Sequence, residues 1–279
     1  MSKRIVVGLD PSDFSKAALE LAQLQAKANN GMVVGVAVVD EPGIARAAMG
    51  AGIGASDFAE KARTQHFADA EAKVRALLES FAGSCVARGV RYEAVRAAGV
   101  PAEVIATAGL GADLIVVGLR TYFHFETRRE PGDTLQELLR DSACPVLAVP
   151  DALDVPWSRA LLPYDGSLMA ARSMRAYVAL AAGLPMERKV LLLRVDDDAT
   201  EGSALLQPPT EYLRAHGFEV EPRVAPGSPP DVVVATAHAE QPTLAVLGAS
   251  GKSSLRAWLF GSVTRALVKD ATTPLFVAG

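Results

Sequence analysis

Residues 4–10, Arg-Ile-Val-Val-Gly-Leu-Asp, and residues 159–165, Arg-Ala-Leu-Leu-Pro-Tyr-Asp, are two versions of one pattern. Each is a short apolar run that ends in Asp, and a serine, Ser12 or Ser167, follows two positions later. A continuous apolar run of this length is typical of a buried parallel strand and too short for a helix. The two serines are expected to cap the helices that follow.

The repetition continues to the end of the chain. The matching stretches are 33–40 with 190–196, 98–108 with 226–237, 113–118 with 243–248, and 144–150 with 273–279. Each repeat therefore alternates strand and helix, which predicts parallel sheets covered by helices on both faces. We expect two tandem doubly wound, Rossmann-like α/β domains, residues 1–150 and 157–279.

The second repeat is shorter than the first. Asp10 and Asp165 are 155 positions apart, whereas Gly118 and Gly248 are only 130 apart. The loss falls after the second strand, where the first repeat has a glycine-containing segment at 45–55, expected to be flexible, and a long helix near 57–88. In the second repeat we expect only a short helix near 210–216, behind Gln207-Pro-Pro209.

Composition excludes several classes of protein. The 279 residues suffice for about two domains. Apolar residues make up 50% and charged residues 22%, as in globular proteins, and the net charge of −4 argues against a basic nucleic-acid binder. Two cysteines, Cys85 and Cys144, cannot form a disulfide scaffold or a four-cysteine zinc site.

The sequence predicts a cytoplasmic protein without a membrane span. The first predicted strand begins within three residues of Met1, which leaves no room for a signal peptide. The longest apolar runs, such as 33–39, are far shorter than the ~20 residues that cross a bilayer.

Ligands of open parallel sheets bind at the carboxyl ends of the strands, where the second repeat has two glycine-rich turns. Gly248-Ala-Ser-Gly251 follows a strand, and Gly261-Ser262 opens a helix whose first N–H groups and dipole favour an anion. On spacing alone, a phosphate cradle and two ordinary capped loops both remain open. A Walker-type P-loop is excluded, because position 246 is Val and not Gly.

The pattern Gly248-x2-Gly251-x9-Gly261-Ser262 resembles the ATP-binding signature of the universal stress protein family. Residues 164–167, Tyr-Asp-Gly-Ser, and 273–278, Thr-Pro-Leu-Phe-Val-Ala, strengthen the resemblance, and the order of elements is similar to that family twice along the chain. The resemblance implies a tandem protein of the stress response that binds ATP, with Mg²⁺, in its second repeat.

At the base end, the resemblance implies roles for four residues. Asp165 would contact the ribose or a phosphate-bound metal ion, and Pro163 would line the pocket beside it. Val195, at the end of a strand, would meet the adenine through its backbone. Leu247 would line the ribose.

At the phosphate end, the resemblance implies roles for five more. Gly248 and Gly251 would line the ribose and the first phosphates. Gly261, Ser262 and Val263 would hold the terminal phosphates through backbone N–H groups and the serine hydroxyl.

The first repeat departs from this pattern. Leu119-Arg-Thr121 follows Gly118 without the second glycine, and Asp133 stands where a serine should meet a phosphate. A carboxylate caps a helix well but repels phosphates. We therefore predict that the first repeat has lost ATP binding and that Asp10 is a strand-end cap. The aromatic and basic stretch 122–130 is interpreted as a surface loop, an interaction surface, or a flap that closes a degenerate pocket.

No arrangement for rapid catalysis is visible, so slow ATP hydrolysis is the most that the sequence predicts. We expect the four histidines, His66, His124, His216 and His238, on the surface, and the carboxylates of 196–198 in solvent rather than on a metal. An adenine-nucleotide enzyme of the same topology would need a Ser-Gly-Gly-x-Asp-Ser loop that 166–171 lacks. A scaffold that binds no nucleotide is the other alternative.

The last strand of each repeat, 146–149 and 275–278, is expected at a sheet edge that must be covered. The resemblance implies that such strands mediate dimerisation, so the two repeats are expected to form a pseudo-dimer within one chain. A further homodimer, and an unidentified protein partner, stay open.

Overall fold

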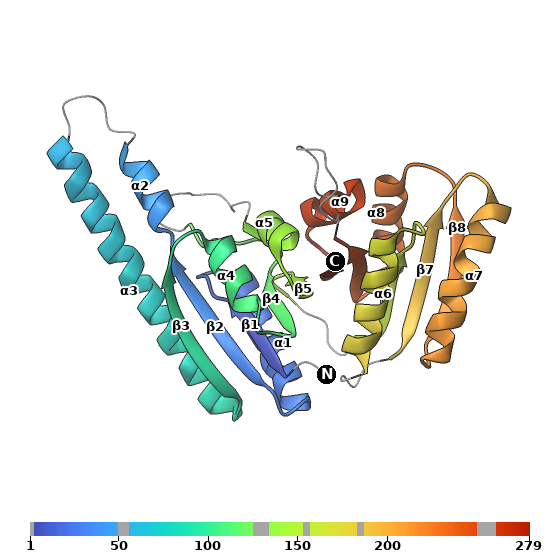
Figure 1. Ribbon diagram of the computed structural model, residues 1–279, viewed down its shortest axis with the longest axis horizontal. Helices are drawn as coiled ribbons and strands as arrows, with labels where there is room; N and C mark the ends of the chain where they lie inside the picture. Colours follow the sequence, from blue (N-terminus) through green and yellow to red (C-terminus); the bar gives the residue numbers. More distant parts are fainter. Residues whose placement is uncertain (1–2, 50–55, 125–133, 153–156, 183–186, 250–260) are drawn as a thin grey trace.

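A computed structural model of the chain describes residues 3–49, 56–124, 134–152, 157–182, 187–249 and 261–279. In this part of the chain the two repeats alternate strands and helices in the same order apart from one extra helix in the first, and both chain ends lie near the middle of the molecule (Figure 1). The α/β fold class predicted from the sequence is confirmed.

The first repeat begins with the strand that ends before Asp10. Its elements are β1 (Arg4–Gly8), α1 (Asp13–Ala28), β2 (Met32–Val39), α2 (Glu41–Met49), α3 (Ser56–Arg88), β3 (Arg91–Ala98), α4 (Pro101–Gly109), β4 (Leu114–Gly118), α5 (Thr134–Asp141) and β5 (Val146–Val149). Ser12 caps α1 as predicted, because its hydroxyl accepts a hydrogen bond from the amide of Ser15 at 3.2 Å.

The second repeat copies this order without a counterpart of α2. Its elements are β6 (Arg159–Pro163), α6 (Leu168–Ala181), β7 (Lys189–Val195), α7 (Ala199–Ala215), β8 (Glu219–Ala225), α8 (Pro229–Glu240), β9 (Leu244–Gly248), α9 (Ser262–Asp270) and β10 (Leu275–Ala278). Ser167 caps α6 in the same way, accepting from the amide of Ala170 at 3.1 Å.

The described strands form one sheet in the order β3-β2-β1-β4-β5-β10-β9-β6-β7-β8. All neighbours are parallel except β5 and β10, which pair antiparallel, with Leu275 opposite Ala148 and Val277 opposite Val146. The last strand of each repeat thus covers that of the other, which confirms the pseudo-dimer expected within one chain.

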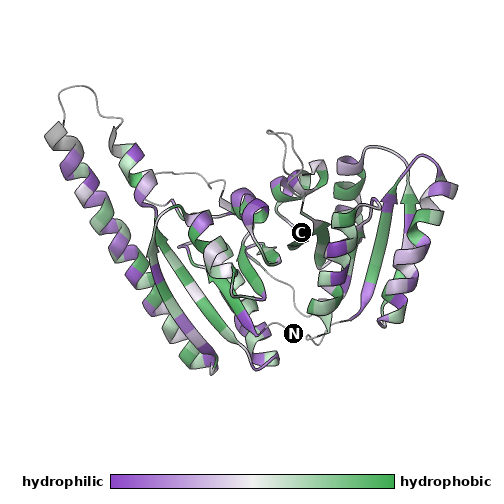
Figure 2. Ribbon diagram, viewed as in Figure 1, coloured by the Kyte–Doolittle hydropathy of each residue, from purple (hydrophilic) through white to green (hydrophobic). Residues whose placement is uncertain are grey.

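Two apolar cores lie on the two faces of this sheet. One face packs against α1, α3, α6 and α7, and the other against α4, α5, α8 and α9. The strands are mostly hydrophobic, whereas the helices mix hydrophobic and hydrophilic residues (Figure 2). Since both faces are covered, the strands need the continuous apolar runs from which they were predicted.

The strand register corrects one residue of the repeat alignment. Gly8 pairs with Val36, and its counterpart Pro163 pairs with Leu193, so Val38 matches Val195. The sequence comparison aligns the ranges 33–40 and 190–196 at their shared Val-Asp ends, which matches Val39 and not Val38 with Val195. The correct register also makes Asp40 the counterpart of Asp197.

The structure corrects two helix predictions. The second repeat has a 17-residue helix, α7, that includes Pro208 and Pro209, not a short helix after them. Asp198 caps its start, and burial of Leu206 and Leu213 against the sheet offsets the cost of the prolines. In the first repeat, α2 occupies the start of the segment predicted to be flexible, and 50–55 lie outside the described residues.

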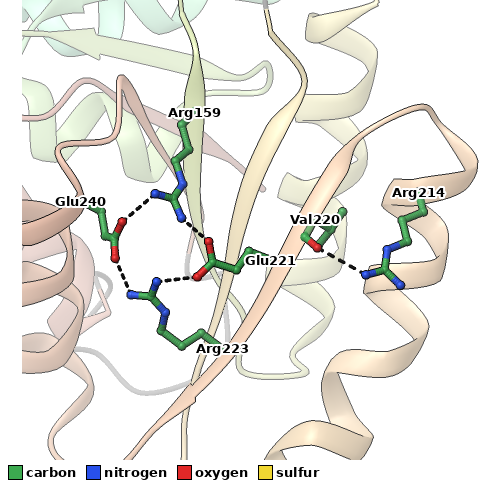
Figure 3. Close-up of polar contacts among 6 residues, drawn as sticks. All are labelled: Arg159, Arg214, Val220, Glu221, Arg223 and Glu240. Atoms are coloured by element: carbon green, nitrogen blue, oxygen red, sulfur yellow. Dashed lines mark hydrogen bonds and ion pairs between the residues drawn. The ribbon is translucent and has the colours of Figure 1, made fainter.

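Four charged residues from β6, β8 and the end of α8 form a closed ring (Figure 3). Arg159 donates to Glu221 at 2.5 Å and to Glu240 at 2.6 Å, and Arg223 donates to the same two carboxylates at the same distances. The hydrogen bond from Arg223 holds the pKa of the Glu240 carboxyl below its ordinary value of 4.5. The ring ties β6, β8 and α8 together.

We predict that Glu240→Gln lowers the melting temperature near neutral pH. Because the folded pKa of Glu240 lies below 4.5, its contribution is present above that value and is lost as pH falls through the folded pKa. The difference from the unmodified chain should therefore shrink below about pH 4 and in about 1 M salt. Thermal unfolding measures it.

Glu187→Gln is the matched control, since Glu187 forms only an exposed pair with Lys189 at 2.9 Å. Such pairs contribute little. A Glu240→Gln effect that is the same at every pH and salt concentration would contradict the ionic role of the ring.

Candidate functional site

The strand order reverses between β6 and β9, and their carboxyl ends leave a crevice there. A pocket of about 510 Å³ opens in this crevice, a volume typical of small-molecule sites. A larger groove of about 940 Å³ lies between α8 and α9, but helix surface residues line it and no strand end reaches it. The crevice pocket is therefore the candidate site.

Eight of the nine residues predicted from the sequence line this one pocket. They are Pro163, Asp165, Val195, Leu247, Gly248, Gly261, Ser262 and Val263. The ninth, Gly251, lies outside the described residues, as does Lys252. These eight come from three strand ends and one helix start, so the fold gathers residues that are far apart in sequence.

Asp165 presents a carboxylate to the pocket. It lies two residues after the end of β6 and is exposed, and its Oδ1 accepts a hydrogen bond from the amide of Ser167 at 2.9 Å. Its Oδ2 has no hydrogen-bond partner among the described residues. A carboxylate oxygen left free in this way can accept from a ligand hydroxyl or hold a cation.

The start of α9 also lines the pocket. Gly261 caps this helix without a side chain, and Ser262 next to it is exposed. Because no side-chain capping bond is made at this end, the first N–H groups and the helix dipole face the pocket mouth. That end suits an anion.

Gly248 is needed for close packing and not for its backbone conformation, since its φ is not positive. A Cβ at Gly248 would lie 2.8 Å from the carbonyl carbon of Met169, so the glycine lets α6 pack onto the end of β9.

Sequence reasoning missed several lining residues, of which Arg194 is the most polar. It donates to Asp196 through Nη2 at 2.6 Å and Nε at 3.0 Å, and to the carbonyl of Asp165 at 3.1 Å. A charged side chain inside the apolar run 190–195 was the signal that could have identified it.

The carboxylates of 196–198 are not simply solvated, as the sequence analysis expected. The Arg194 hydrogen bond holds the pKa of Asp196 below 3.8, and Asp198 caps α7 by accepting from the amides of Thr200 and Glu201. Asp197 accepts from the amide of Gly227 at 3.3 Å. Asp196 and Asp198 thus order the turn into α7, and Asp197 holds the distant loop before α8.

The corresponding crevice of the first repeat is occupied by its own chain. Asp10 is 4% exposed, against the exposed Asp165, and both its carboxylate oxygens have donors. Oδ1 accepts from the amide and hydroxyl of Ser12, and Oδ2 accepts from the amide of Tyr122 at 2.7 Å. Burial raises the pKa of Asp10 above 3.8, although these bonds oppose the shift.

The segment after β4 supplies that covering. Phe123 is buried, and a Cβ at Gly8 would lie 2.8 Å from its ring, so the ring packs against the end of β1. Of the three interpretations of the loop, a flap over the crevice agrees with residues 122–124, and an ordinary surface loop is wrong for them. Residues 125–133, including Asp133, lie outside the described residues.

His124 corrects the expectation that every histidine lies on the surface. It is 8% exposed, its Nδ1 lies 2.5 Å from Oδ2 of Asp40, and its Nε2 lies 3.1 Å from the hydroxyl of Thr134. Burial opposes ionisation of Asp40, but the His124 bond and the Gly43 amide outweigh it and hold the pKa of Asp40 below 3.8. His124 can be buried here because Asp40 accepts a hydrogen bond from its ring.

A sequence model described as the universal stress protein family matches residues 1–150 and 156–279. The chain belongs to the universal stress protein family. No curated protein matches it.

Solved structures that match nearly the whole chain agree on the fold of this universal stress protein. One from Archaeoglobus fulgidus DSM 4304 matches 100% of this chain and 98% of its own, at 21% identity and a TM-score of 0.72. A putative universal stress protein from Pseudomonas aeruginosa UCBPP-PA14 matches 99% and 92%, at 16% identity and a TM-score of 0.67. A universal stress protein in complex with cAMP covers 45% of this chain and 98% of its own, at 24% identity and a TM-score of 0.38.

The described residues of this universal stress protein contain no group of three or more His, Cys, Asp or Glu placed to hold a metal. No helix among them is both long and apolar enough to cross a membrane. Cys85 is buried, and burial raises the pKa of its thiol; Cys144 is half-buried.

We predict that His124→Ala lowers the free energy of unfolding by about 3 kcal/mol, because it leaves the Asp40 carboxylate buried without its partner. His238→Ala is the matched control. His238 also pairs with an aspartate, Asp270 at 2.8 Å, but its side chain is 55% exposed, so the cost should stay under about 1 kcal/mol. Urea unfolding of the two variants measures both, and equal costs would contradict the structural role of His124.

Proposed function

We propose that this universal stress protein binds ATP, with Mg²⁺, in the pocket of its second repeat and acts as a nucleotide-dependent regulator in the stress response. The observation that carries the proposal is the convergence of eight motif residues on one pocket. The pocket has both a free carboxylate oxygen and an N-terminal helix end, which suits a ligand with hydroxyls and phosphates.

The residues present fit the ligand. All six residues line the pocket, and we assign Val195 and Pro163 to the base, Asp165 to the sugar, and Gly261, Ser262 and Val263 to the phosphates. Mg²⁺ takes oxygen ligands and usually keeps substrate phosphates among them, so it would be held chiefly by the phosphates of ATP. We assign binding and not rapid turnover, because the described lining residues include neither histidine nor cysteine.

The first repeat is proposed not to bind the nucleotide. The Asp10 carboxylate and the space beside Gly8, which a ligand would need there, are already occupied. Asp10 accepts a hydrogen bond from the amide of Tyr122, and the ring of Phe123 packs against Gly8. Binding would require displacing a buried aromatic ring, which costs several kcal/mol on the scale of core truncations. A cytoplasmic location and a further homodimer remain proposals on the same footing.

Calorimetric titration of nucleotide-free protein with ATP and Mg²⁺ tests the proposal. We expect one site per chain. A value near two would show that the first repeat binds as well, and the absence of heat would favour a scaffold without nucleotide.

Two variants of Ser262 test where the phosphates lie. Ser262→Asp introduces the residue that the first repeat has at Asp133, and it should weaken ATP binding at least about 100-fold through charge repulsion. Ser262→Ala removes only the hydroxyl and should weaken it about tenfold or less. The melting temperature should hold in both, because the position is exposed and Asp is favourable at a helix start. Equal affinities of the two variants would contradict the assignment.

A further inference from the structure

Arg194 joins the two loops that border the base end of the pocket. Its Nη1 donates to the carbonyl oxygen of Asp165, at the end of β6, at 3.1 Å. Its Nε and Nη2 both donate to Oδ2 of Asp196, at the end of β7. The side chains of Arg194 and Asp196 are 21% and 17% exposed. The guanidinium is thus held between the two strand ends, with its charge balanced by Asp196.

These contacts continue into the starts of two helices. Asp196 Oδ1 accepts from the amide of Asp198 at 3.1 Å, and Asp198 caps α7. On the other side, Asp165 Oδ1 accepts from the amide of Ser167, which caps α6. One chain of hydrogen bonds therefore connects the start of α7 to the start of α6, and Arg194 is its central member.

Packing places α7 directly against the loop after β6. Gly166 has φ of +82°, and a Cβ there would lie 3.0 Å from Leu205 of α7. A Cβ at Gly202 would lie 3.3 Å from that of Asp196. Gly166 therefore lies close to Leu205 of α7, and Gly202 of α7 lies close to Asp196. The position of Asp165, next to Gly166, depends on the position of α7 and on the polar contacts that fix this helix.

The first repeat fixes its strand-end aspartate by other means. The strand register places Ala37 at the position of Arg194, so no such guanidinium exists there. Asp10 is held instead by the amide of Tyr122, from the segment that fills its crevice. In the second repeat the corresponding carboxylate oxygen has no partner among the described residues, and an arginine that bonds to the backbone fixes the loop without using it.

We propose that Arg194 is a positioning residue that holds the Asp165 loop so that the free carboxylate oxygen meets the ribose hydroxyls of the bound nucleotide. The inference rests on the proposed function, because it assigns a specificity determinant to the same site. Arg194 acts through the carbonyl of Asp165, and it favours ribonucleotides over analogues without the hydroxyls.

The first test needs no nucleotide. Hydrogen exchange of the nucleotide-free chain reports the amide of Ser167, which is bonded to Asp165. Arg194→Ala should raise its exchange rate about fivefold or more, and Arg194→Lys should restore part of the protection. Arg188→Ala is the matched control, since Arg188 also donates to a backbone carbonyl, that of His216 at 3.0 Å, but lies outside the pocket lining.

The second test uses ATP and 2′,3′-dideoxy-ATP as probes. The unmodified chain should prefer ATP, and Arg194→Ala should weaken ATP binding about tenfold while leaving the dideoxy analogue nearly unchanged. Asp165→Asn should remove the same preference. The double variant should then lose no more than either single one, because both act on one contact.

The outcomes separate the two proposals. If the unmodified chain binds no ATP, the proposed function fails, and the positioning role in ribose selection fails with it. If it binds ATP but Arg194→Ala leaves exchange at Ser167 unchanged, only the positioning role is overturned. The same holds if Arg194→Ala weakens both probes equally, or if the losses at Arg194 and Asp165 add.

Discussion

The antiparallel pairing of β5 with β10 is the contact on which the rest of the molecule depends. Each repeat alone would expose its last strand as an open edge with unpaired backbone groups. Pairing Leu147 with Phe276 and its neighbours merges both sheets and lets both apolar cores run across the junction. Strands β3 and β8 then form the two edges, and β8 carries Pro222, which cannot extend a ladder.

The two repeats share this sheet but differ at the crevice after their first strand, which is filled in one repeat and open in the other. In both, an aspartate stands two residues after the first strand and two residues before a serine cap. In the first repeat the chain folds back, and Asp10 is buried under its own backbone donors. In the second repeat Asp165 stays exposed, and the residues around it form a pocket. The difference lies in the segment after the fourth strand and in single positions such as Ala37 against Arg194.

Most of the fold could be predicted from the sequence, because buried parallel strands leave a strong signal. The runs 146–149 and 275–278, and the caps at Ser12 and Ser167, coincide with the observed elements. Helix α7 could not be predicted, since two prolines argue locally against it and only its burial against β8 outweighs them. The match of Val38 with Val195 follows from how each strand pairs with its neighbour. A comparison of similar dipeptides along the chain carries no information about that pairing.

The candidate site divides in the same way. Its eight motif residues are at strand and helix ends, which sequence pattern locates well. Arg194 was missed because its importance comes from two loops that meet only in the folded chain. His124 was placed on the surface because nothing near it in sequence reveals Asp40, 84 positions away. Long-range polar partners are the part of a site that periodicity cannot supply.

Carrying both halves of the pseudo-dimer in one chain has a consequence for how the protein can change. In a homodimer every substitution occurs in both subunits, and association falls off on dilution. A tether of a few residues holds its partners at an effective concentration near the millimolar range, whatever the amount of protein present. Each repeat always pairs with the other repeat of its own chain, whose sequence is different. One crevice can therefore close while the other stays open, and the two repeats still remain paired.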